Sequence, residues 1–170
     1  MILKIQLAYP FRCDLQFLTA IFKLLTNLIK MLKDINAPID GIGMQAHYKL
    51  DDYTADRAGW IKNFEASVKA FVDAGVDVQI TELDIRWDGE LTEQRESDQA
   101  EMYGKIFEVA RKYAKTQGKA HGITGVTVWG VYDGCNGAWG TDKYPLVFDT
   151  DKQPKQAYYE IINFREKQTN

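Results

Sequence analysis

Two carboxylates stand close together at the end of an apolar stretch of the chain. The stretch 78–85 is rich in β-branched and aliphatic residues and carries Glu82 and Asp84 near its end. Because strand side chains alternate between two faces, Glu82 and Asp84 are expected to share one face with Val78 and Ile80. Two like charges at the end of a buried strand are costly unless another group neutralises or uses them. The pair therefore indicates either a reactive site or two solvated carboxylates at a strand end.

His47 closes a second apolar stretch, 39–48, and a histidine in such a place is often purely structural. On a strand beside Glu82 and Asp84, its imidazole would bridge the two carboxylates by hydrogen bonds. Such a bridge would keep a carboxylate ionised and oriented, as a nucleophilic carboxylate requires. The spacing therefore favours nucleophilic chemistry over a structural histidine.

Three further side chains are candidates for binding a ligand. Gln45 precedes His47 by two residues and is either a core amide or a partner for a sugar hydroxyl. Trp129 and Trp139 are either core and loop anchors, as tryptophan often is, or flat indole faces for pyranose rings.

Strand-like and helix-like stretches alternate along the chain. Apolar alternation and β-rich runs predict strands over 2–9, 39–48, 78–85 and 123–132. Apolar spacing of three and four predicts helices over 18–32, 60–72, 102–113 and 155–164. The charged stretches 51–57 and 88–98 are expected to be solvated loops. This order predicts an α/β fold of parallel strands, either an open doubly wound sheet or units of a (β/α)₈ barrel.

The placement of polar residues favours the barrel. In a barrel, function lies at the carboxyl ends of the strands. Those ends carry Gln45 and His47 on one predicted strand, Glu82 and Asp84 on the next, and Trp129 on the last. No phosphate-binding glycine motif opens a predicted helix, which argues against a dinucleotide-binding sheet.

Composition excludes several classes of partner. The 170 residues are 45% hydrophobic, enough for the core of one domain, and the net charge of −3 argues against nucleic acid or an anionic membrane. No apolar run is long enough to span a membrane, and Arg12 and Asp14 interrupt the apolar start, so no signal peptide is expected. Cys13 and Cys135 lack metal-ligand spacing and are either bridged or free. We therefore expect no metal or cofactor.

Four phrases, in order and at family-like spacing, resemble glycoside hydrolase family ten, the endo-β-1,4-xylanases. They are PIDGIGMQAH at 38–47, VQITELDI at 78–85, GVTVWG at 125–130, and PLVFD at 145–149 before QAY at 156–158. The similarity covers 28–164 and is to the C-terminal half of the family. It implies a single partial domain over 1–170 with a diverged or foreign start at 1–27. The fold would be parallel (β/α) units of a TIM barrel, a half barrel of strands five to eight rather than a complete (β/α)₈.

The resemblance also implies an activity, namely retaining hydrolysis of internal β-1,4-xylosidic bonds in xylan or xylo-oligosaccharides. Glu82 would be the nucleophile, and His47 and Asp84 would form the relay that orients it. The substrate would be held by Gln45, Trp129 and Trp139. The family further implies an extracellular location and no cofactor.

One part of the family's chemistry is absent from this sequence. The family's proton donor is a Glu in an Asn-Glu pair, and no such pair occurs. Asp84 is a poor substitute because it lies on the same strand as Glu82, whereas the mechanism needs two opposed carboxyls. The chain is therefore expected to need a complementary half barrel for full activity. The alternatives are a non-catalytic carbohydrate-binding or remnant module, and a different retaining barrel glycosidase acting on glucans or mannans. Open sheet edges predict self-association or pairing with a complementary half barrel.

Overall fold

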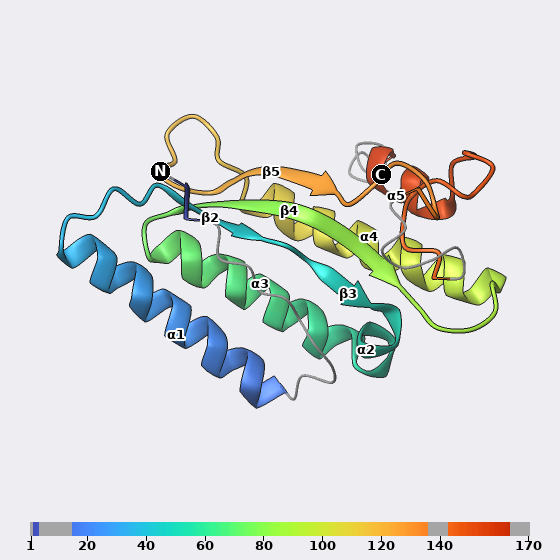
Figure 1. Cartoon of the computed structure of the whole chain (residues 1–170), viewed down its shortest axis with the longest axis horizontal. Coiled ribbons are helices and arrows are strands. Elements are labelled where there is room, and N and C mark those ends of the chain that lie inside the picture. Colours follow the sequence, from blue (N-terminus) through green and yellow to red (C-terminus); the bar gives the residue numbers. More distant parts are fainter. Residues whose placement is uncertain (1, 4–14, 136–142, 164–170) are drawn as a thin grey trace.

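The computed structural model describes residues 2–3, 15–135 and 143–163 as alternating strands and helices. The strands are β1 (Ile2–Leu3), β2 (Gly41–Met44), β3 (His47–Lys49), β4 (Asp77–Arg86) and β5 (Ile123–Val128). The helices are α1 (Leu15–Asp34), α2 (Leu50–Ala55), α3 (Arg57–Asp73), α4 (Glu93–Lys112) and α5 (Gln156–Ile162). Figure 1 shows α1, α3 and α4 running alongside the strands, with α5 near the far end of β4 and β5. None of the described helices is long and apolar enough to span a lipid bilayer.

The strands form one parallel, open sheet in the described part of the chain. Its order is β1, β2, β4, β5, and β3 pairs with the later part of β4 beyond the end of β2. Neighbouring parallel strands require a crossover, and α1, α3 and α4 supply it here. The predicted α/β class with parallel strands is therefore confirmed.

The helices are held on the sheet by one apolar core. On α3 the buried side chains recur at the spacing of a helical stripe, and they include Phe64, Val68 and Phe71. They share the core with Ile42 of β2, Ile80 of β4 and many other residues. Burying each such side chain stabilises the fold by about 1.5–3 kcal/mol.

The stretch 51–57 is mainly helical and 93–98 belongs to α4, so the prediction of solvated loops is wrong for these residues, whereas 88–92 is an exposed loop as predicted. The helix α2 is anchored by Leu50 and Tyr53, which are almost fully buried. The helix α4 begins at Glu93 because the hydroxyl oxygen of Thr92 accepts a hydrogen bond from the Arg95 amide at 3.3 Å. The charged residues of α2 and of the first turns of α4 therefore lie on the surfaces of these two helices.

The predicted strand 39–48 is interrupted between β2 and β3. Ala46 has a φ of +67°, a left-handed conformation that a strand does not tolerate. Its carbonyl still accepts a hydrogen bond from the Asp84 amide at 3.2 Å, so the chain continues along the same side of β4. The interruption turns the direction of the strand just before His47.

A bulge in β4 changes which side chains share a face. Met44 pairs with Ile80, and His47 pairs with Asp84. The chain therefore advances by three residues from β2 to β3 where β4 advances by four, so β4 contains one extra residue. The register of β4 against β5 shifts in the same place. The even alternation predicted across 78–85 is therefore wrong, because the extra residue separates the face of Ile80 from that of Asp84.

Candidate active site

His47 connects the two carboxylates of β4. Its Nδ1 lies 2.7 Å from Asp84 Oδ2, and its Nε2 lies 3.2 Å from Glu82 Oε2. The Asp84 side chain is fully buried, whereas those of His47 and Glu82 are 15% and 23% exposed. A ring nitrogen must carry a proton to donate to an ionised carboxylate. The geometry therefore fits an imidazolium that donates to both carboxylates, with Glu82 as the member that a ligand can reach.

The surroundings of His47 favour its charged form. Burial alone would lower the pKa of His47, because a charged ring loses its hydration. The hydrogen bond and charge of Asp84, followed by those of Glu82, act in the opposite direction. They raise the pKa of His47 above its ordinary value of 6.5. The positive charge is therefore kept to higher pH than in an isolated histidine.

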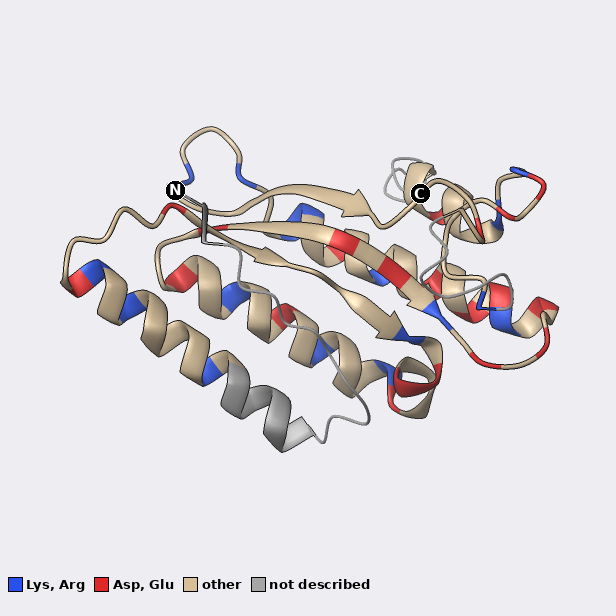
Figure 2. Cartoon of the chain, viewed as in Figure 1, with Lys and Arg blue, Asp and Glu red and all other residues tan. Residues whose placement is uncertain are grey.

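Strand pairing brings these groups together. The parallel register of β3 and β4 places His47 opposite Asp84, near the carboxyl end of both strands. Figure 2 shows the two acidic residues within the later part of β4, followed by the basic Arg86 at its end. A guanidinium nitrogen of Arg86 lies 3.9 Å from Asp84 Oδ1. Parallel α/β sheets place ligands at such strand ends.

The ring of Trp129 packs beside His47. The two rings lie edge-on, with centroids 5.8 Å apart and planes at 79°, and Trp129 is 40% exposed. Its amide donates to the Leu83 carbonyl at 2.9 Å, which fixes it to β4. Gln45 is half-buried in the interruption between β2 and β3. Trp139 lies outside the described residues.

Sequence reasoning missed a set of buried polar residues near the carboxyl end of β4. Gln99 and Tyr103 are fully buried on α4, and Asp133 and Lys155 form a buried ion pair nearby. The sequence contained one signal, because Gln99 precedes the apolar stripe of α4 by one helical turn. The helix predicted over 102–113 began too late to include it.

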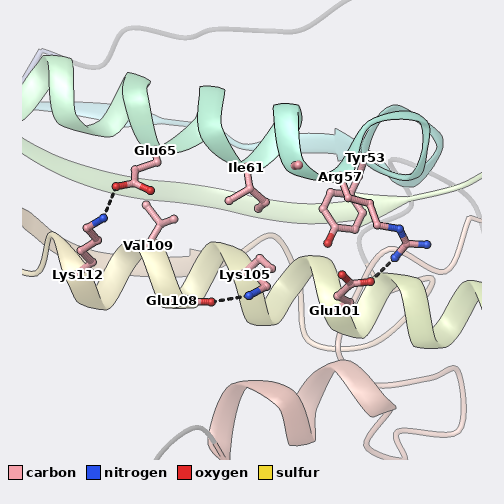
Figure 3. Close-up of a pocket in the computed structure, with 10 residues that line it drawn as sticks. Tyr53, Arg57, Ile61, Glu65, Glu101, Lys105, Glu108, Val109 and Lys112 are labelled. Carbon is pink, nitrogen blue, oxygen red and sulfur yellow. Dashed lines mark hydrogen bonds and ion pairs between the residues drawn. The ribbon is translucent and has the colours of Figure 1, made fainter. Parts of the chain in front are cut away.

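A groove of about 350 Å³ lies elsewhere, between α3 and α4 (Figure 3). Ile61 and Val109 are among its apolar lining residues. Charged pairs join the two helices across it, one of them between Lys112 Nζ and Glu65 Oε1 at 2.5 Å. None of the relay residues lines this groove, so it is separate from the candidate site.

Comparison with known protein families identifies the family of this chain. Residues 16–164 match Glycosyl hydrolase family 10. The chain belongs to this family. A β-1,4-xylanase from Dictyoglomus thermophilum is 38% identical over 151 residues, covering 81% of this chain and 40% of the relative. The family match begins at residue 16, before the segment that carries the resemblance in the sequence.

Solved structures of family members share the fold. A psychrophilic family 10 endo-β-1,4-xylanase is 35% identical and superposes with a TM-score of 0.71, over 86% of this chain and 42% of that structure. An intracellular xylanase from Thermoanaerobacterium saccharolyticum is 33% identical with a TM-score of 0.67, over 83% of this chain and 39% of that structure. The chain thus spans less than half of these relatives. The expected fold, a part of a TIM barrel rather than a complete one, is confirmed.

The expectation of an extracellular location is corrected by the same comparison. It rested only on the family resemblance, yet the xylanase from T. saccharolyticum is described as intracellular. Because a family member with this fold acts inside the cell, membership of family 10 does not imply export.

Proposed function

We propose that this chain carries the nucleophile side of a retaining endo-1,4-β-xylanase site, within a single partial family 10 domain over 1–170. In this proposal Glu82 is the nucleophile and His47 and Asp84 orient it. The substrate contacts are Gln45, Trp129 and Trp139. The observation that carries the proposal is the pair of hydrogen bonds from one imidazole to both β4 carboxylates.

The proposed reaction uses the negative charge of Glu82 and the positive charge of His47. The Glu82 carboxylate attacks the anomeric carbon, the bond to the leaving oxygen breaks, and a xylosyl ester of Glu82 forms. Water then cleaves this ester and restores the carboxylate. Asp84 holds Nδ1–H of His47, so the ring presents Nε2–H to Glu82 in a fixed orientation. This arrangement places a charged hydrogen-bond donor against Glu82 and fixes the orientation of the carboxylate that attacks.

The proton donor of this reaction must come from outside this sequence. Retaining hydrolysis uses two carboxyls about 5–5.5 Å apart on opposite sides of the scissile bond. Glu82 and Asp84 are bound to the same imidazole, and Asp84 is fully buried, so they are not an opposed pair. A complementary part of a barrel would supply the acid.

Covalent trapping tests the proposal. An aryl 2-fluoro-β-xylobioside with a dinitrophenyl leaving group needs no protonation, and its fluorine slows hydrolysis of the ester. We expect intact-mass spectrometry to show one added fluoroxylobiosyl group, which peptide mapping places on Glu82. The Glu82→Gln variant keeps the size of the side chain and should remain unlabelled. An unlabelled wild-type chain, under conditions that label a complete family member, would contradict the proposal.

A non-catalytic carbohydrate-binding role is the second candidate. The absent Asn-Glu pair and the exposed Trp129 favour it. A mutant of the T. saccharolyticum xylanase has been solved with xylotetraose bound, which supports xylo-oligosaccharides as ligands here. Binding alone would shift tryptophan fluorescence with xylotetraose, without labelling of Glu82 and without release of reducing sugar.

We also propose that this chain self-associates, because an apolar stripe of α1 faces solvent. The stripe is formed by Leu24, Leu28 and Met31 of α1 and by Ile35 directly after its end, which are 68%, 39%, 65% and 73% exposed. Its spacing of four, three and four residues makes one continuous helical face. The stripe and the open sheet edges are surfaces that a second copy would cover.

Sedimentation velocity tests this assembly. The wild-type chain should sediment as a dimer or larger oligomer, and the double variant Leu24→Lys/Met31→Glu should shift it towards monomer. Lys30→Gln on the same helix is the control and should leave the oligomer intact. A folded wild-type chain that stays monomeric at all concentrations would show the proposal to be wrong.

A further inference from the structure

The later part of β4 has a second neighbour beyond the end of β5. The Ile85 amide donates to the Pro145 carbonyl at 3.1 Å, and the Trp87 amide donates to the Lys143 carbonyl at 3.3 Å. The segment 143–148, which we call the flanking segment, therefore lies against this edge of β4 and is joined to it by backbone hydrogen bonds. On the opposite edge, β3 pairs with 84–86. The end of β4 that bears Asp84 is thus held from both sides.

Two side chains of α4 fasten the flanking segment to β4. Gln99 Nε2 donates to the Ile85 carbonyl at 2.7 Å and to the Tyr144 carbonyl at 2.6 Å. Tyr103 Oη donates to the Pro145 carbonyl at 2.8 Å. Both side chains are fully buried, so water does not compete for these bonds. The helix α4 therefore ties the backbone next to Asp84 to the flanking segment.

A buried ion pair also holds this segment. Lys155 Nζ donates to Asp133 Oδ2 and to the Tyr144 carbonyl, each at 2.9 Å, and both charged side chains are at most 3% exposed. Asp133 Oδ1 also accepts from the Leu146 amide at 2.7 Å. A buried ion pair is weak evidence for stability, since apolar replacements are often as stable. A role in fixing geometry explains its presence better.

The backbone at the centre of this arrangement is strained. Tyr144 has a φ of +43°, a left-handed conformation that costs a non-glycine residue about 1–3 kcal/mol. Its carbonyl is the shared acceptor of Gln99 and Lys155. Its ring packs against Trp87, with centroids 5.2 Å apart. The two buried donors thus stabilise a turn that the chain would otherwise avoid.

We propose that Gln99, Lys155 and Asp133 are positioning residues that fix the β4 carboxylates against His47 through the flanking segment. The Ile85 amide and carbonyl are both held by this arrangement, and Ile85 directly follows Asp84. This inference rests on the proposed function in one respect, because the proposed function gives Glu82 and Asp84 the roles that require a fixed position. Loosening of the flanking segment weakens the hydrogen bonds that Asp84 and Glu82 make with His47.

The titration of His47, followed by NMR without substrate, tests this inference. The sequence has two histidines, and His121 lies beside Asp77 at the opposite end of β4, where it serves as an internal reference. In Gln99→Met and in Lys155→Met we expect the pKa of His47 to fall by about one unit, because its carboxylate partners move away. The ring C–H chemical shifts of His121, which lies far from both substitutions, should be the same in every variant at a given pH. Amide exchange at Ile85 and Trp87 should become about tenfold faster or more.

Lys112→Met is the matched control, because it removes a lysine from an exposed ion pair with Glu65 on the outer surface. It should leave the titration of His47 unchanged. If Gln99→Met lowers the melting temperature but leaves the pKa of His47 unchanged, the residues are structural only and the proposal is overturned. Gln99→Met leaves no buried charge behind, so it decides the question if Lys155→Met does not fold. The titration of His47 does not depend on labelling of Glu82. A failure of the proposed function would therefore be seen in the covalent trapping experiment and not in this one.

Discussion

The polypeptide 1–170 is expected to release dinitrophenolate from an aryl β-xylobioside at least about a thousandfold faster than it cleaves xylotetraose. A dinitrophenolate leaves without a proton, whereas a sugar alcohol must be protonated as its bond breaks. General acid catalysis contributes about 10²–10⁴-fold to such steps. The family's Asn-Glu donor is absent from this sequence, and Asp84 is buried against His47. The rate over a series of aryl leaving groups should therefore depend steeply on their acidity.

Azide and the Glu82→Gln variant provide the controls for this leaving-group dependence. Azide attacks a xylosyl ester without help from a general base, so it should accelerate turnover and give a xylobiosyl azide. Glu82→Gln should release no dinitrophenolate above background with or without azide. Equal rates on the aryl glycoside and on xylotetraose would place a proton donor within 1–170 and contradict the expectation.

Much of the fold follows from residue spacing, and the exceptions have physical causes. The stripe of Phe64, Val68 and Phe71 predicted α3 because helical spacing is a local property of the sequence. The bulge in β4 was not predictable in this way, since it depends on the register that two neighbouring strands impose. The helix α2 was missed because its charges were more conspicuous than the two residues that anchor it, Leu50 and Tyr53.

In the candidate site, too, some features could be predicted from the sequence and others could not. The hydrogen bonds that His47 makes with Glu82 and Asp84 join side chains whose types already suggested a relay, although their catalytic roles stay predictions. Gln99 and Lys155 were missed because their shared acceptor is the Tyr144 carbonyl, and every residue type has a backbone carbonyl. Sequence patterns indicate which side chains can react. They do not indicate which backbone groups those side chains will hold.

Replacing Asp84 with Asn is expected to slow labelling of Glu82 by about a hundredfold or more. The substitution keeps the size of a fully buried side chain and removes the charge that anchors Nδ1–H of His47. The imidazole can then present either tautomer, and only one places Nε2–H against Glu82. Loss of a comparable orienting carboxylate costs about 10⁴-fold in serine proteases. The measurement is the rate of intact-mass change with the fluoroxylobioside.

The pH dependence of labelling gives the same prediction a second measurement. As pH rises through the pKa of His47, Nε2–H is lost and its support of Glu82 disappears, so the labelling rate should fall on the alkaline side. Asp84 raises the pKa of His47, so in Asp84→Asn this fall should occur at lower pH than in the wild-type chain. Asp73→Asn removes an exposed carboxylate from α3 and should change neither rate nor pH profile. An Asp84→Asn variant that labels at the wild-type rate would remove Asp84 from the relay, and Glu82 would then depend on His47 alone.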